Sequence, residues 1–481
     1  MRVLDTKWMA GVLSFVLVFA FLSIVGNTYY PFDSGFYYRF SLVFAGDEGF
    51  SLRSFPYTLR GIVFPLMLLP FNQIAQIIWG DTLRGWYLFI SSFSAVFSML
   101  FPFVFKGLGK ANNIVIPLLL QIMVYFGLFL VPLVDLVALW MLIFSLAFIK
   151  IAYTYVERRG LQKRYLVLFV LSGATFYISY NTRTIYQFAI FGMILILITN
   201  IRLLKHKAQN VAIVLAFVIG VFSIAGVQIY SNMHTIDSFS ISPAQTHYRG
   251  LPLNHFQLQV GMGVNLYETS LVENEGLAVS YTNHSGNLVL RELGHPQLGS
   301  LSDYLSWVFA FPIEFIGVYM RHLIVMLNPI SGGGYVYFRN NSRFILTMLN
   351  YTMLFVATCY IKRNMLDLSL SEIKGKFKSI SNDAKNSVLS IFTILLPFIA
   401  ITPGAVEERF GLPFWIVIYG LFCYCINLKE EFEYFKKRWL SYVLIYLFTF
   451  GVFIAILTEI YASNTSGVFL PILDLSSFFN R

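Results

Sequence analysis

Runs of apolar residues, separated by short polar segments, occur along the whole chain. Runs such as VLSFVLVFAFLSIVG and NVAIVLAFVIGVFSIAGV reach or approach the length that a helix needs to cross the roughly 30 Å hydrocarbon core of a membrane. The pattern predicts an all-α polytopic protein with about eleven transmembrane helices. The expected spans are residues 9–28, 85–105, 112–131, 135–153, 165–181, 185–201, 210–230, 344–361, 387–403, 412–427 and 439–459.

Two further apolar stretches fit a membrane span poorly. The stretch 61–80 has Pro65 and Pro70 inside it, and proline interrupts the hydrogen bonds of a helix interior. The stretch 305–330 contains an acid, an arginine and a histidine. We therefore expect the first to lie on the membrane surface or to re-enter the membrane, and the second to lie at the interface.

Composition supports the membrane assignment. Of the 481 residues, 57% are hydrophobic and 12% are charged, and a soluble chain of this length would need more charge to cover its surface. The first apolar run lacks a small-residue cleavage site, so we interpret it as a retained span. The three cysteines lie within or at the ends of apolar runs and define no disulfide framework or metal site.

Lysine and arginine residues cluster in short segments between the apolar runs. If 61–80 and 305–330 do not cross, every cluster lies on one side of the membrane, which the positive-inside bias assigns to the cytoplasm. The sequence thus predicts a multi-pass inner-membrane protein with a cytoplasmic N-terminus, and the bias explains the net charge of +10 without nucleic acid. The clusters are Arg2 and Lys7; Lys106 and Lys110; Arg158, Arg159, Lys163 and Arg164; Arg202, Lys205 and Lys207; six residues of 362–386; and Lys429, Lys436, Lys437 and Arg438.

The opposite, extracytoplasmic face receives most of the other ionisable residues. We divide the chain into an N-terminal transmembrane module, 1–230, with a first outer loop at 29–84; an extracytoplasmic or interfacial segment, 231–343; and a C-terminal transmembrane module, 344–481. Charged residues at span ends are costly and often functional, so their convergence on one face indicates a site. The residues are Asp33, Arg60, Asp135, Arg183, Glu407, Glu408 and Arg409.

Each of these residues also has a structural explanation. Asp135 could be a helix N-cap or a first-turn acid, and Arg183 could be an arginine that reaches the interface. Glu408 and Arg409 could form a solvated surface pair, and Asp33 could favour a turn after a proline.

The residue types on this face suit the chemistry of a lipid-linked phosphate. Guanidinium groups bind phosphate in a bidentate manner, and a carboxylate can take a proton from an attacking hydroxyl. Tyr37 and Tyr38, close to Asp33, are candidates for stacking on a sugar ring. The segment 231–343 could cover such a site, and Gly332 to Gly334 would give part of it mobility.

Five stretches together resemble the GT-C superfamily of integral-membrane glycosyltransferases, which use polyprenyl-phosphate sugars as donors. FDSGFYY resembles the catalytic first outer loop, and EERFGLPFW resembles a late Arg-aromatic-x-x-Pro element at a helix entrance. Several branches have a second acid after the first, where this chain has Ser34. In TLRGIVFP, which resembles an Arg-Pro-rich element, the proline usually next to the arginine is absent. The other three stretches are TLRGIVFP, VDLVALWMLIFSLAF and FPIEFIGVYMRH.

The resemblance implies inverting transfer of a sugar from a polyprenyl-phosphate donor to a glycan acceptor such as O-antigen or lipopolysaccharide, on the extracytoplasmic face. Asp33 would be the catalytic base, and Arg409, Arg183 and Arg60 would neutralise the leaving phosphate. The resemblance allows a divalent cation, Mg²⁺ or Mn²⁺, although the sequence shows no metal-ligating motif. The remaining acids, Asp135, Glu407 and Glu408, would support the site.

Two other functions remain open at the level of sequence. An O-antigen polymerase or ligase acting on lipid diphosphates would also use arginines in an outer site but would depend less on a first-loop acid. A flippase or transporter of lipid-linked sugars would need a site near the bilayer midplane, usually with internal repeats, and we find no repeat.

Overall fold

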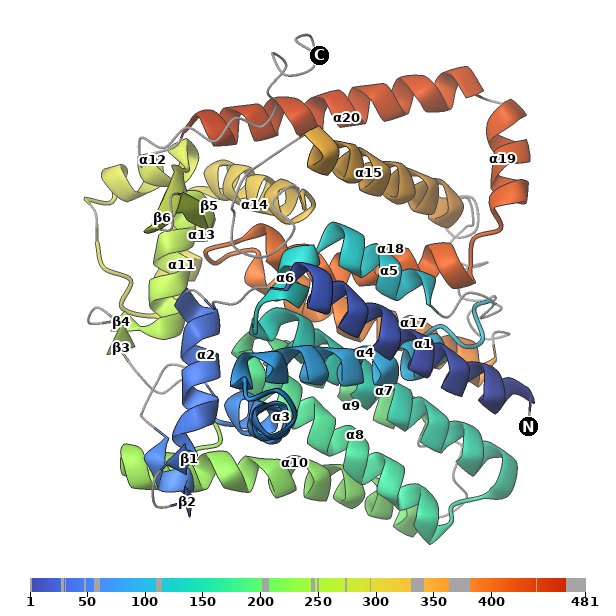
Figure 1. Cartoon of the computed structure of the whole chain (residues 1–481). Helices are drawn as coiled ribbons and strands as arrows, with labels where there is room; N and C mark the ends of the chain where they lie inside the picture. The colour runs from blue at the N-terminus through green and yellow to red at the C-terminus, as the bar shows by residue number, and fades with distance from the viewer. Residues whose placement is uncertain are drawn as a thin grey trace.

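The structure is a computed structural model of a helical bundle (Figure 1). In Figure 1 the N-terminus and α19 (Leu428–Lys437) lie on the right, and the α11–α14 segment lies on the left. The structure describes residues 2–26, 30, 32–46, 49–55, 61–109, 115–200, 207–243, 247–248, 251–272, 275–294, 296–329, 341–362, 381–437 and 439–463.

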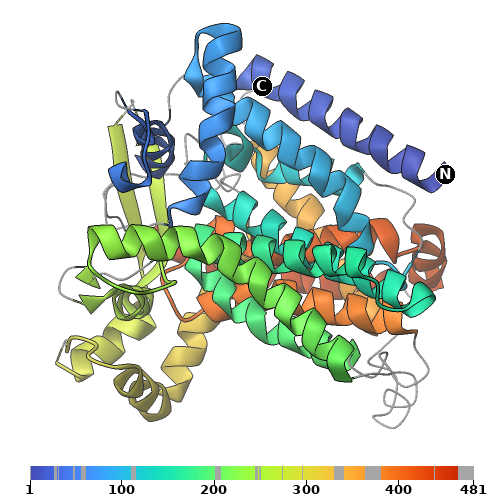
Figure 2. The ribbon, with the colours of Figure 1, turned by 90° about the horizontal axis from the view of Figure 1, so that it is seen from below.

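Five long helices form the main body of the bundle and pack in sequence order. α1 contacts α4, α4 contacts α7, α7 contacts α8 and α8 contacts α10 (Figures 1 and 2). α7 lies in the middle, and almost all of its side chains up to Tyr153 are buried. The five helices are α1 (Arg2–Val25), α4 (Gly85–Val104), α7 (Val134–Arg159), α8 (Lys163–Thr182) and α10 (Lys207–Thr235).

Glycines bring α8 and α10 into backbone contact. A Cβ atom on Gly173 would lie 2.0 Å from the Phe217 carbonyl oxygen, and one on Gly220 would lie 2.0 Å from the Val170 carbonyl oxygen. Small residues at helix contacts allow such close approach within membranes, where packing rather than the hydrophobic effect drives helix association.

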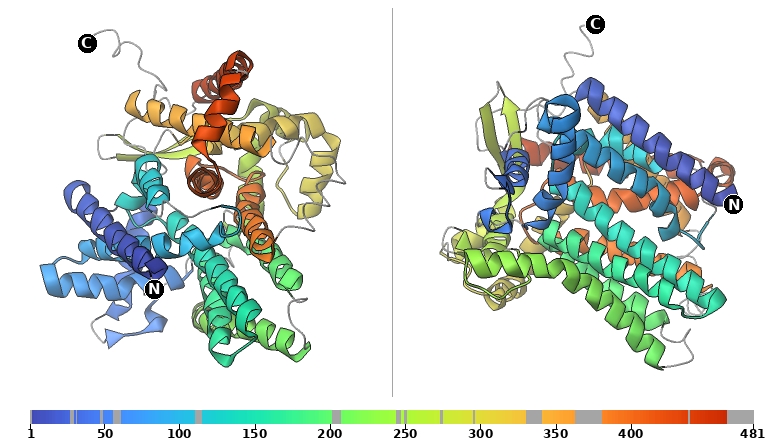
Figure 3. Two further views of the ribbon diagram at one scale, coloured as in Figure 1. Left: turned by 90° about the vertical axis from the view of Figure 1, so that its right-hand side faces the viewer. Right: turned by 60° about the horizontal axis from the view of Figure 1, so that its bottom comes forward.

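A further group of helices, α9 and four helices from the second half of the chain, lies beside this body (Figure 3). α17 packs against α9, and α18 packs against α17 and α15. α20 crosses the top of Figure 1 next to α15, and its buried residues are confined to its last two turns. The helices are α9 (Ala189–Asn200), α15 (Asn341–Ile361), α17 (Asn382–Ile401), α18 (Leu412–Tyr424) and α20 (Trp439–Ala462).

The described helices confirm a multi-pass membrane protein but not the predicted number of spans. Six of them are long and apolar enough to cross a membrane, or eight if each of two bent pairs is one span. The expected span 112–131 is broken at Tyr125 into α5 (Ile116–Val124) and α6 (Phe126–Leu130). α8 contains several polar residues, and α9 is shortened because the 3₁₀ helix η3 (Thr184–Phe188) takes its first turn.

The two ambiguous stretches are helical. The first forms α3 (Val63–Trp79), with Pro70 inside it. The second forms α13 (Leu301–Ala310) and α14 (Pro312–Met326), which are bent by 108° relative to each other. The stretch 305–330 is therefore a broken span or a re-entrant pair rather than one straight helix.

The segment 231–343 departs from the all-α expectation. After α11 (Leu253–Gly263), β5 (Val264–Val272) and β6 (Glu275–Thr282) form an antiparallel hairpin. Their β-branched and aromatic residues favour strands, a local pattern that the dominant apolar periodicity of the chain concealed. Two shorter sheets are also described: β1 (Ala45–Gly46) with β2 (Gly49–Phe50), and β3 (His247–Tyr248) with β4 (Leu251–Pro252); α12 (His284–Glu292) follows the hairpin.

Candidate functional site

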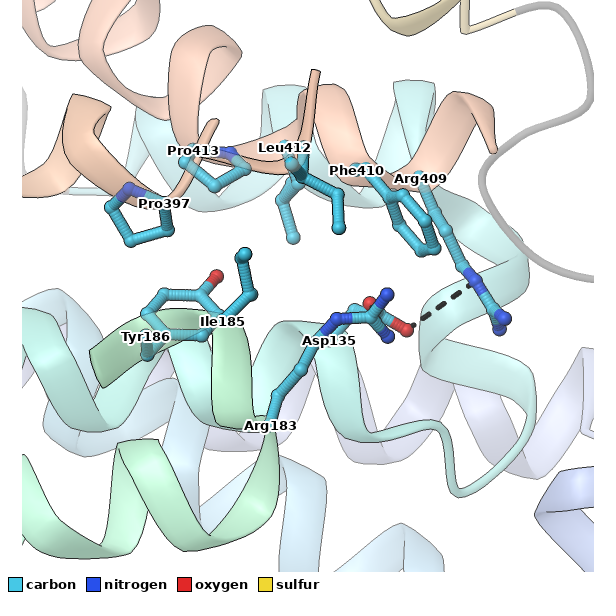
Figure 4. A pocket seen from close by; sticks show the side chains of 10 residues that line it. Asp135, Arg183, Ile185, Tyr186, Pro397, Arg409, Phe410, Leu412 and Pro413 are labelled. Carbon is cyan, nitrogen blue, oxygen red and sulfur yellow. Dashed lines mark ion pairs between the residues drawn. The ribbon is translucent and has the colours of Figure 1, made fainter. Parts of the chain in front are cut away.

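Two arginines from distant parts of the chain face one buried carboxylate. Asp135 lies in the first turn of α7 and is 4% exposed. One of its oxygens, Oδ1, lies 2.5 Å from an Nη atom of Arg183. Its other oxygen, Oδ2, lies 3.5 Å from Nε of Arg409, a looser contact (Figure 4). The N-terminus of a helix favours an anion, which helps to place the acid here.

Local backbone structure brings the two arginines to this point. Arg183 is the extended residue that ends α8, where its N–H donates to the Ser179 carbonyl, and η3 follows it. Arg409 lies in the 3₁₀ helix η6 (Glu408–Gly411), which enters α18. A Cβ atom on Gly411 would lie 1.8 Å from the Met326 carbonyl oxygen, so this glycine allows η6 to lie directly on the end of α14.

Two neighbours complete the arginine environment. Glu407 accepts a 2.8 Å hydrogen bond from an Nη atom of Arg409. Phe410 lies under the Arg183 guanidinium, 4.1 Å from ring centroid to Cζ, a cation–π contact. Burial raises the pKa of the Glu407 carboxyl, and the guanidinium groups of Arg409 and Arg183 only partly offset this effect.

The two adjacent acids point in different directions. Glu407 lies with the arginines, whereas Glu408 accepts a 2.6 Å hydrogen bond from the hydroxyl of Tyr461 in α20. Glu408 is 2% exposed and the Arg409 side chain 12%, so they do not form the solvated surface pair that the sequence allowed. Asp135 is a first-turn acid rather than an N-cap, because Leu133 occupies the capping position.

The arginines line one end of a pocket whose remaining wall is apolar apart from the hydroxyl of Tyr186 (Figure 4). Sequence reasoning identified Asp135, Arg183 and Arg409, and its Arg-aromatic-x-x-Pro element contained Phe410 and Pro413, but the rest of the wall was missed. Tyr186 had a signal, since it follows Arg183 at helical spacing, whereas Pro397 had none. The ten lining residues are Asp135, Arg183, Ile185, Tyr186, Pro397, Ile401, Arg409, Phe410, Leu412 and Pro413.

The described candidate residues of the segment 29–84 lie outside this pocket. Asp33 is in the first turn of α2 (Phe32–Val43), which packs against α3, and it is not one of the ten lining residues. Tyr37 is buried with its ring edge-on to Phe64, which leaves little of its surface for a sugar. Tyr38 is half-buried and its hydroxyl contacts that of Thr82.

Arg60 lies outside the described residues, but the glycine after it packs against the end of α8. A Cβ atom on Gly61 would lie 2.1 Å from the Asn181 carbonyl oxygen. The side chain of Asn181 accepts from the Val63 N–H at 3.0 Å and donates to Gln228 of α10 at 2.8 Å. These buried amides hold the start of α3 against α8 two residues before Arg183, and sequence reasoning missed them.

No cluster of three or more His, Cys, Asp or Glu side chains that could hold a metal ion occurs in the described part of the chain. The charged groups brought together here are the guanidinium groups of Arg183 and Arg409 and the carboxylates of Asp135 and Glu407, so their formal charges balance. Comparison of this chain with protein-family models, curated proteins and solved structures gave no match, so no relative assigns a function to these residues.

Proposed function

We propose that this protein transfers a sugar from a polyprenyl-phosphate donor to a glycan acceptor, at the membrane face where Asp135, Arg183 and Arg409 meet. The observation that carries the proposal is the pair of arginines on either side of one buried carboxylate, beside an apolar wall. Guanidinium groups bind phosphate oxygens through paired charge-assisted hydrogen bonds and stabilise the charge that develops as the phosphate leaves.

The apolar wall suits the lipid part of such a donor. Pro397, Leu412 and Pro413 line the part of the pocket beyond the arginines in Figure 4, and Ile401 also lines the pocket. The first isoprene unit would lie along these side chains while the phosphate meets Arg183 and Arg409, and the pocket, which is narrow, would have to widen to admit it. Because the carboxylates already hold the arginines, little ordering of these long side chains would accompany binding.

In this mechanism the acceptor hydroxyl attacks the anomeric carbon, the bond from that carbon to the phosphate oxygen breaks, and the proton passes to a base. Asp33 is our candidate base, on the resemblance of FDSGFYY to a catalytic outer loop. Asp135 and Glu407 would keep the arginines in position. Glu408 would help to fix the backbone of η6, the 3₁₀ helix that contains Arg409.

A second function is favoured by the position of Asp33 outside the arginine pocket. An enzyme that polymerises or ligates glycans from a lipid diphosphate needs the arginines but depends less on a first-loop acid. The products that accumulate in cells lacking this protein separate the two. A lipid-monophosphate sugar supports transfer from that donor, and an unpolymerised lipid-diphosphate repeat supports the second function and contradicts the first.

Binding tests the phosphate site directly. Detergent-purified protein should bind undecaprenyl phosphate, a representative carrier, and the double variant Arg183→Ala/Arg409→Ala should lose most of this affinity. Equal binding by the double variant and the unaltered protein would remove the arginine pair as the phosphate site.

A further inference from the structure

The last described helix, α20, has its buried residues at its C-terminal end, while earlier side chains such as Tyr446 meet α15 at the surface. The buried residues of α20 are Leu457, Ile460 and Tyr461, whereas Leu444 and Phe448 nearer its start are exposed. Its exposed side chains are apolar along most of its length, as expected for a helix surrounded by lipid.

Three elements are tied to α20 at this end. The Tyr461 hydroxyl donates to Oε1 of Glu408 in η6 at 2.6 Å. Glu459 pairs with Arg321 of α14 at 3.0 Å. Ser463, directly after the helix, accepts from the Thr282 N–H of β6 at 3.1 Å. The ring of Tyr461 also meets that of Tyr281 edge-on, with centroids 5.2 Å apart.

The contact with Glu408 matters because that carboxylate is buried. A buried carboxylate needs hydrogen-bond donors, and a bond from a hydroxyl to an ionised oxygen is short and strong. η6 contains only four residues, Glu408 to Gly411, so fixing the first fixes the backbone of the second, Arg409. Arg409 then reaches Glu407 and Asp135.

We propose that Tyr461 is a positioning residue for Arg409 and acts through Glu408, so that the last helix sets the geometry of the phosphate site. The consequence for carrier binding rests on the proposed function. The effect of Tyr461 on η6 does not rest on the proposed function, because the hydrogen bond from Tyr461 to Glu408, the residue before Arg409, is present without any ligand.

α20 provides a matched control for the test. Tyr446 also lies in α20, and its hydroxyl bonds to that of Thr352 at 3.1 Å on the exposed side. Tyr461→Phe and Tyr446→Phe each remove one hydroxyl from the same helix. Hydrogen–deuterium exchange of the peptide 405–412 should be faster in Tyr461→Phe than in the unaltered protein and unchanged in Tyr446→Phe. Unchanged exchange in Tyr461→Phe would overturn the proposal.

Carrier binding gives the second readout. Tyr461→Phe should weaken binding of undecaprenyl phosphate about 5- to 20-fold, and Tyr446→Phe should not. The expected loss is smaller than the roughly 10- to 150-fold of a lost direct hydrogen bond to a charged group, because Tyr461 acts on the phosphate only through Arg409. In an Arg409→Ala background the loss should disappear, because Arg409 would no longer need positioning. A loss of the same size in that background would indicate general destabilisation and overturn the positioning role.

The two proposals can fail separately. If the unaltered protein does not bind the carrier but Tyr461→Phe loosens 405–412, the proposed function is wrong and the positioning role stands. If Arg409→Ala abolishes carrier binding while Tyr461→Phe binds normally, the positioning role is wrong and the function stands. Should Tyr461→Phe not fold, Glu408→Gln tests the same contact, since it keeps the shape and weakens the hydrogen bond; normal exchange and binding in that variant overturn the role.

Discussion

Asp135 and Arg183 form a 2.5 Å ion pair that joins the start of α7 to the end of α8. The two helices form an antiparallel pair, so this contact closes the end of the pair opposite their connecting turn. The carboxylate is nearly buried and the Arg183 side chain is 21% exposed. Asp135 is thus enclosed by the fold, whereas part of the Arg183 guanidinium remains accessible from the pocket.

We expect the interaction between Asp135 and Arg183 to contribute measurably to the free energy of unfolding. Asp135→Asn or Arg183→Gln alone should lower the free energy of unfolding, because each leaves its partner uncompensated. The double variant should lose less than the sum of the single variants, with a coupling energy of about 1–3 kcal/mol. Denaturation of the detergent-purified proteins gives the values, and strict additivity would mean that the pair is not formed.

Arg409 should matter for the carrier through its fork-shaped guanidinium. Arg409→Lys keeps the charge but loses bidentate geometry, so it should bind undecaprenyl phosphate at reduced affinity, whereas Arg409→Ala should bind about 10- to 150-fold more weakly. Arg84→Ala is the control, since Arg84 is half-exposed and pairs with Asp81 away from the pocket. Affinity lost to the same extent in the control would indicate a nonspecific charge effect.

Asp33 is the residue on which the two enzyme functions differ. Asp33→Asn should fold normally and lose roughly 100- to 10,000-fold in transfer rate if Asp33 is the general base. Asp303→Asn provides a matched control, because Asp303 is also a first-turn acid, at the start of α13. Near-normal turnover by Asp33→Asn would remove this residue from the mechanism and favour the lipid-diphosphate enzyme.

The predicted sidedness can be tested with cysteine labels at exposed positions. Ser34 and Thr182 are unsuitable because both are buried. In a variant lacking the three native cysteines, Ser302→Cys at the start of α13 should react with a membrane-impermeant reagent in intact cells, and Lys163→Cys at the start of α8 should not. Failure of Ser302→Cys to react, or reaction of Lys163→Cys, would contradict the assignment of the site to the extracytoplasmic face.

Sequence reasoning reached the charged part of the site because charge at the end of an apolar run is rare and easily seen. Asp135, Arg183 and Arg409 were found in this way, and the structure places them together. Sequence reasoning could not identify Tyr461 as the partner of Glu408. A tyrosine at the end of an apolar helix is common, and 53 residues separate the two.

The fold shows the same division. Long apolar runs such as that of α7 were predicted well, whereas the break at Tyr125 and the bend between α13 and α14 were not located. Such interruptions depend on the tertiary contacts of single residues, and a hydropathy pattern averages over them. The buried amides of Asn181 and Gln228 were missed for a related reason, because an amide in an apolar run has no partner until two helices meet.

The glycine contacts between α8 and α10 have a consequence for the site some distance away. Gly173 lies against the backbone of α10, and Gly220 lies against the backbone of α8. These two close contacts oppose sliding of α8 along α10, because a shift by one residue would bring a side chain against a carbonyl oxygen of the other helix. The position of Arg183 at the end of α8 is thereby fixed relative to α10 by backbone contacts in the interior of the bundle.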